Sequence, residues 1–200
     1  MKIPNNIIVL DLEATCCWSN DNLPENAIHE TIEIGAVRII NGKMDVNVFQ
    51  QYVKPKVNPI LDIECTNLTG IVQSTIDNAP SFPEALSAFM KWMNLNSDTT
   101  ESELPWLISW GHYDRFQLAQ DCTRFNLDTN WLFRHTSLKH EYMRLNKSRR
   151  PVGLGKALRN ENLVFDGRPH SGLDDAINIS KIFNIYSERL EYVKQTSITK

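Results

Sequence analysis

The spacing of apolar and polar residues predicts three strands in the first quarter of the chain. Residues 7–10 are a short apolar run, which is typical of a buried strand and predicts a strand over residues 7–12. Residues 30–40 and 43–55 are rich in β-branched and aromatic residues, and they flank Asn41-Gly42, a dipeptide typical of a tight hairpin turn. The polar, proline-containing residues 19–30 predict an exposed loop between the first two strands. This region therefore predicts a three-stranded antiparallel meander.

Helical spacing of apolar residues alternates with further strands in the rest of the chain. Residues 82–94, 114–126 and 173–193 carry apolar side chains every three or four positions, and Ser81 with Glu84 has the spacing of a capping box. The apolar runs at residues 106–110 and 131–138 predict a fourth and a fifth strand. A meander followed by strands that alternate with helices predicts an α/β fold in which helices flank a mixed five-stranded sheet.

Length and composition are those of one globular unit. With 200 residues, 42% of them hydrophobic, the chain can bury its own core, so we expect a single domain over residues 1–200 with its core at residues 7–186. No apolar run approaches the roughly 20 residues of a membrane-spanning helix, and the first residues lack a signal-peptide pattern. The four cysteines include no C-x-x-C pair, which is typical of thiols in a reducing compartment. We therefore expect a cytoplasmic protein without a membrane partner.

The charge of the chain is unevenly distributed. A formal net charge of −3 argues against nucleic-acid binding through overall basicity. Residues 139–159, however, contain seven lysines and arginines against one acidic residue. This stretch is either a solvated basic loop or a surface that binds phosphates.

Three carboxylates stand at positions where the pattern should be apolar. Successive strand residues point to opposite faces of a sheet, so Asp11 and Glu13 share one face while Leu10 and Leu12 occupy the other. Two ionised groups on a buried strand are unfavourable unless a cation compensates them, so the pair is either a strand end entering solvent or part of a metal site. Asp114 begins the buried stripe of the second helix, where it is either a helix cap or an inward carboxylate.

Helical spacing also distinguishes the two acidic residues at the start of the final helix. Asp175 precedes Ile179 and Phe183 at positions i+4 and i+8, which is the face that packs on the sheet. Asp174 shares its side of the helix with Asn178. We therefore expect Asp175 to point inward and Asp174 to point outward, near the helix N-terminus.

At these residues the sequence resembles the DEDDh superfamily of 3′-to-5′ exonucleases, the DnaQ-like or RNase T group. The resemblance lies in VLDLEATC (9–16), SWGHYDRFQLAQDC (109–122) and HSGLDDA (170–176), where the spacing H-x-x-x-x-D runs from His170 to Asp175. The stretches DLEATCCW and FDGRPHSGLDDAINISKI are similar to the branch with the histone-mRNA 3′-end exonuclease and KapD-type proteins, which acts mainly on RNA 3′ ends. This resemblance implies an RNase H-like fold. No SAP-like extension precedes the motifs in this sequence, so a stem-loop substrate is not expected.

The resemblance implies hydrolysis assisted by two divalent cations. Oxygen ligands from Asp and Glu suit Mg²⁺ or Mn²⁺ better than zinc. By resemblance, Asp11 bridges the ions, Glu13 and Asp175 complete the first, and Asp114 holds the second. Histidine exchanges protons near neutral pH, so His170 is assigned as the general base for the attacking water. The implied reaction releases 5′-mononucleotides from the 3′ end of single-stranded nucleic acid, with RNA favoured over DNA.

Two further segments are expected to contact the substrate. TNLTGI (66–71) resembles the family's loop at the 3′-terminal nucleotide, although it also reads as an ordinary turn. A cluster of basic residues before the His170 motif is expected to follow the phosphates of the strand. The expected contacts are Thr69, Gly70 and Ile71, with Ile71 against the last base, and Lys147, Arg149 and Arg150. Trp18 is either a base-stacking or a core residue.

Two other functions remain open at this point. An RNase H-type endonuclease shares a carboxylate-rich sheet but lacks the arrangement around His170, and it would cleave a circular oligonucleotide. A catalytically silent nucleic-acid-binding protein on the same fold would show no turnover. Laddering of a 5′-labelled strand with Mg²⁺ or Mn²⁺ would separate these possibilities.

Overall fold

A mixed sheet forms the centre of the molecule in the computed structural model, which describes residues 3–16, 28–44, 47–95 and 98–195. The order of the strands is β3-β2-β1-β5-β6, and β4 also pairs with β2. The strands are β1 (Asn6–Ala14), β2 (Thr31–Ile40), β3 (Lys43–Met44), β4 (Phe49–Tyr52), β5 (Trp106–Ser109) and β6 (His135–Ser137). The predicted third strand is interrupted, because β3 and β4 are separate segments that pair with the same neighbour. The predicted mixed sheet with an antiparallel meander is otherwise confirmed.

Strand pairing follows the predicted hairpin and then reverses direction. β1 and β2 are antiparallel, with Ile7 opposite Ile39 and Glu13 opposite Glu33. The turn between β2 and β3 has positive φ at both Asn41 (51°) and Gly42 (77°), as a two-residue hairpin turn requires. β5 and β6 then add to β1 in parallel. The parallel strands end on the same side as β1, which brings their following segments to one edge.

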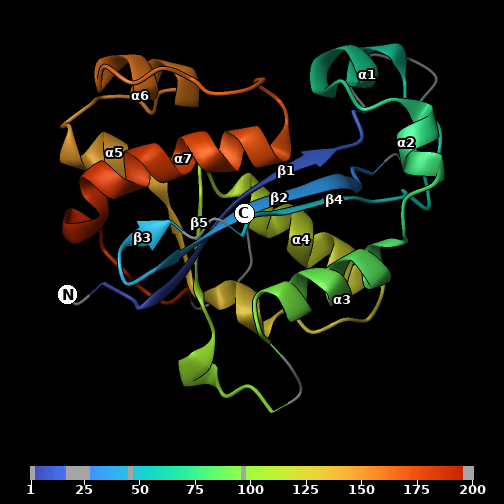
Figure 1. Ribbon diagram of the computed structural model, residues 1–200, viewed down its shortest axis with the longest axis horizontal. Helices are drawn as coiled ribbons and strands as arrows, with labels where there is room; N and C mark the ends of the chain where they lie inside the picture. Colours follow the sequence, from blue (N-terminus) through green and yellow to red (C-terminus); the bar gives the residue numbers. More distant parts are fainter. Residues whose placement is uncertain (1–2, 17–27, 45–46, 96–97, 196–200) are drawn as a thin grey trace.

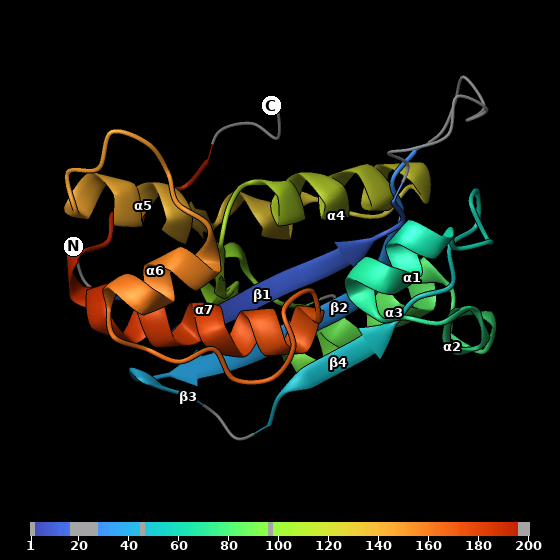
Figure 2. The ribbon, with the colours of Figure 1, turned by 90° about the horizontal axis from the view of Figure 1, so that it is seen from above.

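The helices cover both faces of the sheet. Figures 1 and 2 show α7 on one side of β1 and β2 and α4 on the other, while α1 and α2 lie together at the end toward which β1 runs. The α-helices are α1 (Ile63–Thr69), α2 (Gln73–Asp77), α3 (Phe82–Trp92), α4 (Tyr113–Arg124), α5 (Leu138–Leu145), α6 (Leu154–Asn160) and α7 (Gly172–Tyr186). Short 3₁₀ turns span Glu101–Glu103, Asn130–Phe133 and Ser187–Arg189. No helix in the described ranges has both the length and the apolar character to cross a membrane.

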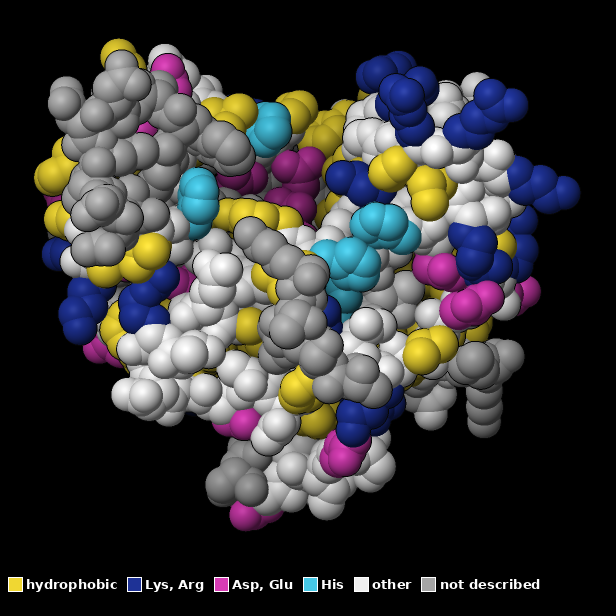
Figure 3. Space-filling view, turned by 180° about the vertical axis from the view of Figure 1, so that it is seen from behind, with side chains coloured by type: hydrophobic (Ala, Val, Ile, Leu, Met, Phe, Trp, Pro, Cys, Tyr) yellow, Lys and Arg dark blue, Asp and Glu magenta, His cyan; other side chains and the backbone are white. Residues whose placement is uncertain are grey.

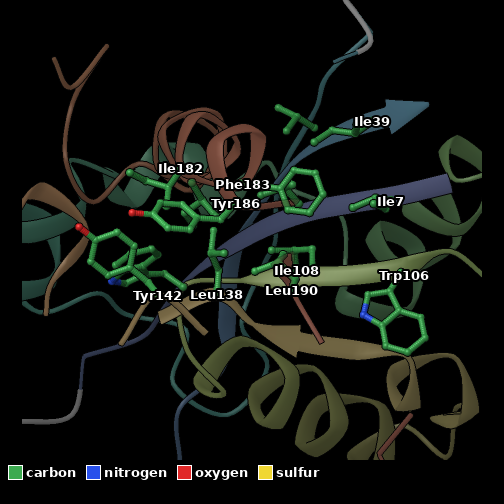
Figure 4. Packing of buried hydrophobic residues seen from close by; sticks show 14 of the residues in the cluster. Ile7, Ile39, Trp106, Ile108, Leu138, Tyr142, Ile182, Phe183, Tyr186 and Leu190 are labelled. Carbon is green, nitrogen blue, oxygen red and sulfur yellow. The ribbon is translucent and has the colours of Figure 1, made fainter. Parts of the chain in front are cut away.

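The sheet separates two apolar cores, one on each of its faces. Ile7 and Val9 pack with Phe183 of α7, whereas Ile8 and Leu10 pack on the opposite side with Phe89 of α3. Figure 4 shows the first core, with Ile182, Phe183 and Tyr186 of α7 lying over the strands that carry Ile7 and Ile108. A smaller cluster of Ile32, Cys65, Ile71 and Ile76 joins α1 and α2 to the start of β2. This alternation decides which side each carboxylate of β1 takes.

Two predicted elements differ from the structure. The predicted strand at 131–138 is mostly a 3₁₀ turn, because the Leu132 amide bonds to the Thr129 carbonyl (3.0 Å), and only His135–Ser137 joins the sheet. The final helix ends at Tyr186 and not near residue 193. The chain beyond it folds back, held by the Tyr192 hydroxyl on the Ser187 carbonyl (2.9 Å), and Leu190 still reaches the α7 core. Tertiary contacts therefore set both boundaries.

The structure also contains helices that the pattern did not indicate. α1 covers part of the segment 66–71, which also read as an ordinary turn, and α2 follows it, while α5 and α6 occupy much of the basic stretch 139–159. These helices have five to eight residues, too few for a clear apolar period. The exposed loop predicted at 19–30 lies largely outside the described residues, and its last residue, Glu30, is buried.

Candidate active site

Asp11 and Glu13 lie on the α7 side of the sheet. They continue the alternation of Ile7 and Val9, which face α7, whereas Leu12 packs in the opposite core. The prediction that both carboxylates point the same way is therefore confirmed. Glu13 is only 8% exposed, and Asp11 is partly exposed beside it.

Asp114 reaches the same place from α4. This helix begins at Tyr113, four residues after the end of β5. The Leu12 amide donates to Asp114 Oδ1 (3.2 Å), so the carboxylate is attached to β1. Asp114 is 5% exposed, and the predicted inward direction is confirmed.

Asp175 and His170 come from α7 and the turn before it. Asp175 lies in the first turn of α7, and its Oδ2 accepts the backbone N–H of His170 (2.9 Å). His170 has a φ of 63°, a left-handed conformation that histidine adopts more readily than β-branched residues. One possible ligand atom from each of Glu13, His170 and Asp175 lies within 4.8 Å of the others. Figure 3 shows acidic side chains at the floor of a hollow on this face, with histidines on both sides.

Close packing of β2 and α7 holds Asp175 near β1. A Cβ on Gly35 would lie 2.0 Å from the Gly172 carbonyl carbon, so only glycine fits at residue 35. Glu33 Oε2 accepts the Gly172 N–H (3.2 Å), and its Oε1 accepts the Gln50 side chain (2.8 Å). Glu33 is 1% exposed and directly opposite Glu13. Glu33 thus joins the site as a fifth carboxylate, which the sequence had not led us to expect. It stands two residues before Gly35, on the same face of the predicted strand, and this acidic residue on a strand could have indicated a place in the site.

Asp174 does not point away from the protein as predicted. Its Oδ2 accepts the Arg168 N–H (2.8 Å), and its carboxylate fills the space that a Cβ on Gly167 would need. Asn178, on the same side of α7, is fully buried and donates to the carbonyls of Asp166 (2.7 Å) and Asp174 (2.8 Å). The turn of residues 166–170 folds over this side of the helix, which the helical period could not indicate. We call this segment the His170 turn.

Burial and mutual repulsion disfavour the ionised forms of these carboxylates. Burial, followed by the charge of Asp114, raises the pKa of Asp11 well above its ordinary value. Burial, followed by the charges of Asp175 and Glu33, raises the pKa of Glu13 to about 8. Burial raises the pKa of Asp175 to about 6, although the hydrogen bond from His170 opposes the shift. Burial also raises the pKa of Asp114.

This donor set fits hard divalent cations. In the described part of the chain, no lysine or arginine forms an ion pair with Asp11, Glu13, Glu33, Asp114 or Asp175. Carboxylates gathered without neutralising partners need another source of positive charge when ionised. Their oxygens are the ligands that Mg²⁺ and Mn²⁺ take in proteins, whereas a structural zinc site is built mainly from thiols and imidazoles. The candidate group found among the described residues, Glu13, His170 and Asp175, contains one imidazole and no thiol.

Three other histidines, His112, His135 and His140, form a separate group, in which His112 lies two residues before Asp114. The ring of His112 stacks on His140 with centroids 4.8 Å apart, and the ring of His135 lies 5.7 Å from His112. Burial lowers the pKa values of His112 and His135. The candidate group of metal ligands in the part of the chain that the structure describes does not include these three histidines.

The predicted substrate contacts have mixed positions. Ile71 is 4% exposed and packs in the small core with Ile76, so the expected apolar contact with the last base is wrong for its side chain. Thr69 is also buried, with its hydroxyl on the Cys65 carbonyl (2.8 Å). Exposed apolar side chains nearby include Leu68, at 44%, in the last turn of α1.

The structure describes the predicted basic contacts but not Trp18. Lys147, Arg149 and Arg150 are exposed in the connection between α5 and α6. Figure 3 shows lysine and arginine side chains gathered on one rim of the hollow. Trp18 lies outside the described residues.

Comparison with known proteins places this geometry in a family. The exonuclease (RNase T) family model matches residues 8–183. The 3′-5′ exoribonuclease 1 of Mus musculus is 32% identical over 186 residues, which cover 88% of this chain and 51% of that protein. The 3′-5′ exonuclease Snipper of Drosophila melanogaster is 30% identical over 88% of this chain and 67% of its own length. The chain therefore spans about half the length of the first of these relatives.

A solved structure agrees with this placement. The crystallographic structure of the nuclease domain of 3′hExo, a DEDDh family member bound to rAMP, superposes with a TM-score of 0.80. It is 28% identical, and the match covers 96% of this chain and 98% of that domain. The RNase H-like arrangement predicted from the three motifs is confirmed. The chain belongs to the exonuclease (RNase T) family and is similar to its DEDDh members.

Proposed function

We propose that this protein is a metal-dependent 3′-to-5′ exonuclease that removes 5′-mononucleotides from single-stranded nucleic acid, with RNA favoured over DNA. One observation carries the proposal: Asp11, Glu13, Asp114 and Asp175 converge from β1, α4 and α7, and the His170 ring lies beside two of them. The relatives named exoribonucleases support the choice of RNA. The 2′-hydroxyl is the group by which such a preference would be read.

The four acidic residues would hold two cations, Mg²⁺ or Mn²⁺. Asp11 would contribute to holding both ions, since it lies among the other three and the charges of Asp114, Asp175 and Glu13 all act on it. Glu13 and Asp175 would complete one site, and Asp114 the other. When bound, such a pair stabilises the charge on the attacking and leaving oxygens of an in-line displacement.

His170 would take the proton from the attacking water. Its ring is exposed and within 4.8 Å of Glu13 and Asp175 oxygens, so it can reach a water that lies between the acidic residues and solvent. The bond from its backbone N–H to Asp175 keeps the turn in place while leaving both ring nitrogens available. Histidine suits this transfer near neutral pH.

The substrate strand would approach between α1 and the basic connection of α5 and α6. Leu68, exposed at the end of α1, would pack against the terminal base in place of Ile71, and Gly70 would offer only backbone atoms. Lys147, Arg149 and Arg150 would contact upstream phosphates. Lys139, also in the basic stretch, acts electrostatically on Asp114 and would lie nearer the cleaved bond.

A labelled strand tests this function directly. The wild-type protein, incubated with a 5′-labelled single-stranded RNA and Mg²⁺ or Mn²⁺, should produce a ladder shortened from the 3′ end, and EDTA should stop it. A DNA strand of the same sequence should be degraded more slowly. A circular strand should stay intact, which separates an exonuclease from an endonuclease.

Matched variants complete the experiment. Asp11→Ala should abolish laddering and His170→Ala should slow it strongly to a rate that is still measurable, whereas Glu188→Gln, a change at an exposed residue of the 3₁₀ turn after α7, should leave it unchanged. Absence of laddering on every linear substrate, with RNA binding retained, would instead favour a catalytically silent binding protein. The cytoplasmic location and the single-domain organisation remain predictions.

A further inference from the structure

We propose that Arg168 is a positioning residue that ties the His170 turn to the C-terminal end of α1, and so keeps the proposed general base aligned with the segment that receives the terminal nucleotide. The inference deepens the proposed exonuclease function and rests on it. Arg168 itself touches none of the reacting atoms, since its guanidinium is bound to backbone carbonyls of α1.

The contact is a cap on α1 supplied from far along the chain. Arg168 Nη1 donates to the Thr69 carbonyl (3.0 Å), and its Nη2 donates to those of Asn67 (3.2 Å) and Leu68 (3.0 Å). The last carbonyls of a helix lack partners within the helix and carry partial negative charge. α1 has no basic residue in its own last turn, so Arg168 provides this charge.

Gly70 makes room for the guanidinium. It ends α1 in a left-handed conformation, with φ of 69°, and its N–H bonds to the Thr66 carbonyl (2.8 Å). A Cβ at residue 70 would lie 1.2 Å from Arg168 Nη1. Glycine at this position therefore serves both the backbone turn and the approach of Arg168.

The other end of the connection is fastened to α7. The backbone N–H of Arg168 bonds to Asp174 (2.8 Å), and that of His170 to Asp175 (2.9 Å). Asn178 holds Asp166 at the start of the turn through both its side-chain oxygen (3.0 Å) and nitrogen (2.7 Å). The turn is therefore fastened to α7 at Asp166, Arg168 and His170. The Arg168 side chain connects α1 to this same segment, so the position of His170 depends on that connection.

α1 is in turn connected to the strand that carries the central carboxylates. The Cys65 thiol contacts the Ala14 carbonyl (3.6 Å), one residue beyond Glu13. The Arg168 charge also acts on Glu13, where it opposes the rise in pKa. Arg168 thus lies where β1, α1 and the His170 turn meet, and its loss should loosen the last two from each other.

The test compares Arg168→Ala with a matched control in two backgrounds. Arg134→Ala is the control, because Arg134 also donates to two helix-turn carbonyls, of Glu101 (2.9 Å) and Ser102 (3.4 Å), away from the carboxylates. Arg168→Ala should lower kcat about ten- to a hundredfold, as expected for a misplaced catalytic group, with KM changed far less. Arg168→Lys should recover part of the lost kcat, and Arg134→Ala should leave kcat unchanged.

A double-mutant cycle distinguishes positioning from general stabilisation. If Arg168 acts through His170, adding Arg168→Ala to His170→Ala should lower kcat by less than about twofold more. The proposal would be overturned if Arg168→Ala lowered kcat by the same factor in the wild-type and His170→Ala backgrounds, or if it lowered kcat in neither. Each variant is first checked for the wild-type Tm and circular dichroism.

Hydrogen exchange tests the connection without relying on activity. Arg168→Ala should speed amide exchange in residues 66–71 and in residues 168–175 together, and Arg134→Ala in neither. Faster exchange in only one segment would overturn the inference. If the wild-type protein degraded no strand, the proposed function would fail, while the exchange data would still decide whether Arg168 couples the two segments.

Discussion

Glu13 and Glu33 lie directly opposite each other on adjacent strands, with both carboxylates turned toward α7. Like charges in this position repel each other, and the charge of Glu33 contributes to the raised pKa of Glu13. A favourable contact elsewhere must offset this repulsion. The hydrogen bond from the Gly172 N–H to Glu33 fastens the start of α7, and the Glu33 carboxylate also adds negative charge beside the proposed cation site.

Glu33 variants should separate these two contributions. Glu33→Gln keeps an oxygen for the Gly172 N–H but removes the charge, whereas Glu33→Ala removes both. We expect Glu33→Gln to weaken Mg²⁺ binding and lower kcat about tenfold, and Glu33→Ala about a hundredfold. Isothermal titration with Mg²⁺ and strand-degradation kinetics measure the two effects. Equal results for the two variants would show that the hydrogen bond to Gly172 does not matter.

Asp11→Asn should stabilise the metal-free protein while strongly lowering its activity. Asp11 is repelled by every neighbouring acidic group, and the amide is nearly the same size without the charge. The free energy of unfolding in EDTA at about pH 8 should rise by on the order of 1–2 kcal/mol, whereas kcat should fall about a hundred- to a thousandfold. Urea unfolding and strand degradation test these expectations. A variant less stable than wild type in EDTA would contradict the account of repulsion.

The stability of the metal-free protein should depend on pH through the same groups. Asp175, with a pKa raised from 3.8 to about 6, and Glu13, with a pKa raised from 4.5 to about 8, bind protons more tightly when folded. The folded state therefore holds more protons between these limits, and the free energy of unfolding falls as the pH rises through them. Between about pH 6 and 8, the further fall in the free energy of unfolding comes from Glu13.

Mg²⁺ should remove this loss, because the cation favours the ionised forms. The Tm gained with Mg²⁺ over EDTA should therefore grow as the pH rises from about 5 to 8, and Glu13→Gln should flatten the increase above about pH 6. Thermal unfolding in the two conditions measures the difference directly. A gain that is constant with pH would mean that these carboxylates are already ionised without metal.

Gly35→Ala should displace α7 from the sheet. The added methyl would overlap the backbone at Gly172, which cannot move without shifting Asp175. We expect a loss of about 3 kcal/mol in stability together with a large fall in activity. Gly155→Ala is the control, since its Cβ would meet only the Arg159 side chain at 3.6 Å within α6, and alanine there should be neutral or stabilising by up to about 1 kcal/mol. Chemical denaturation of both variants checks the contrast.

Removal of the basic side chains between α5 and α6 should affect binding and not chemistry. The triple variant Lys147→Ala, Arg149→Ala and Arg150→Ala should raise KM with little change in kcat. Each lost phosphate contact should reduce the slope of log Kd against log salt by about 0.7 for a single strand. Lys91→Ala, an exposed change on α3, should leave both unchanged. An unaltered salt slope in the triple variant would show that this surface does not contact the strand.

Local periodicity placed the four acidic residues on the inward faces of their elements, and the resemblance to the DEDDh superfamily selected them as members of one site. The period of two along β1 placed Asp11 and Glu13 on one face, and the period of 3.6 along α7 selected Asp175 over Asp174 as the inward residue. These periods hold wherever an element is long enough to bury one face. They therefore also gave the helices α3, α4 and α7 and the meander, although not the end of α7.

What remained depended on contacts between segments distant in the sequence. Glu33 belongs to the site only because the register of β1 and β2 sets it opposite Glu13, and Arg168 reaches α1 across about one hundred positions of the chain. Ile71 is buried because α1 and α2 close over the start of β2, which no local pattern expresses. The sequence by itself determined which face of the long elements β1, α4 and α7 turns toward the interior, since that is a property of each element. Only the tertiary structure decided which of them meet, because register and the approach of two backbones depend on both partners at once.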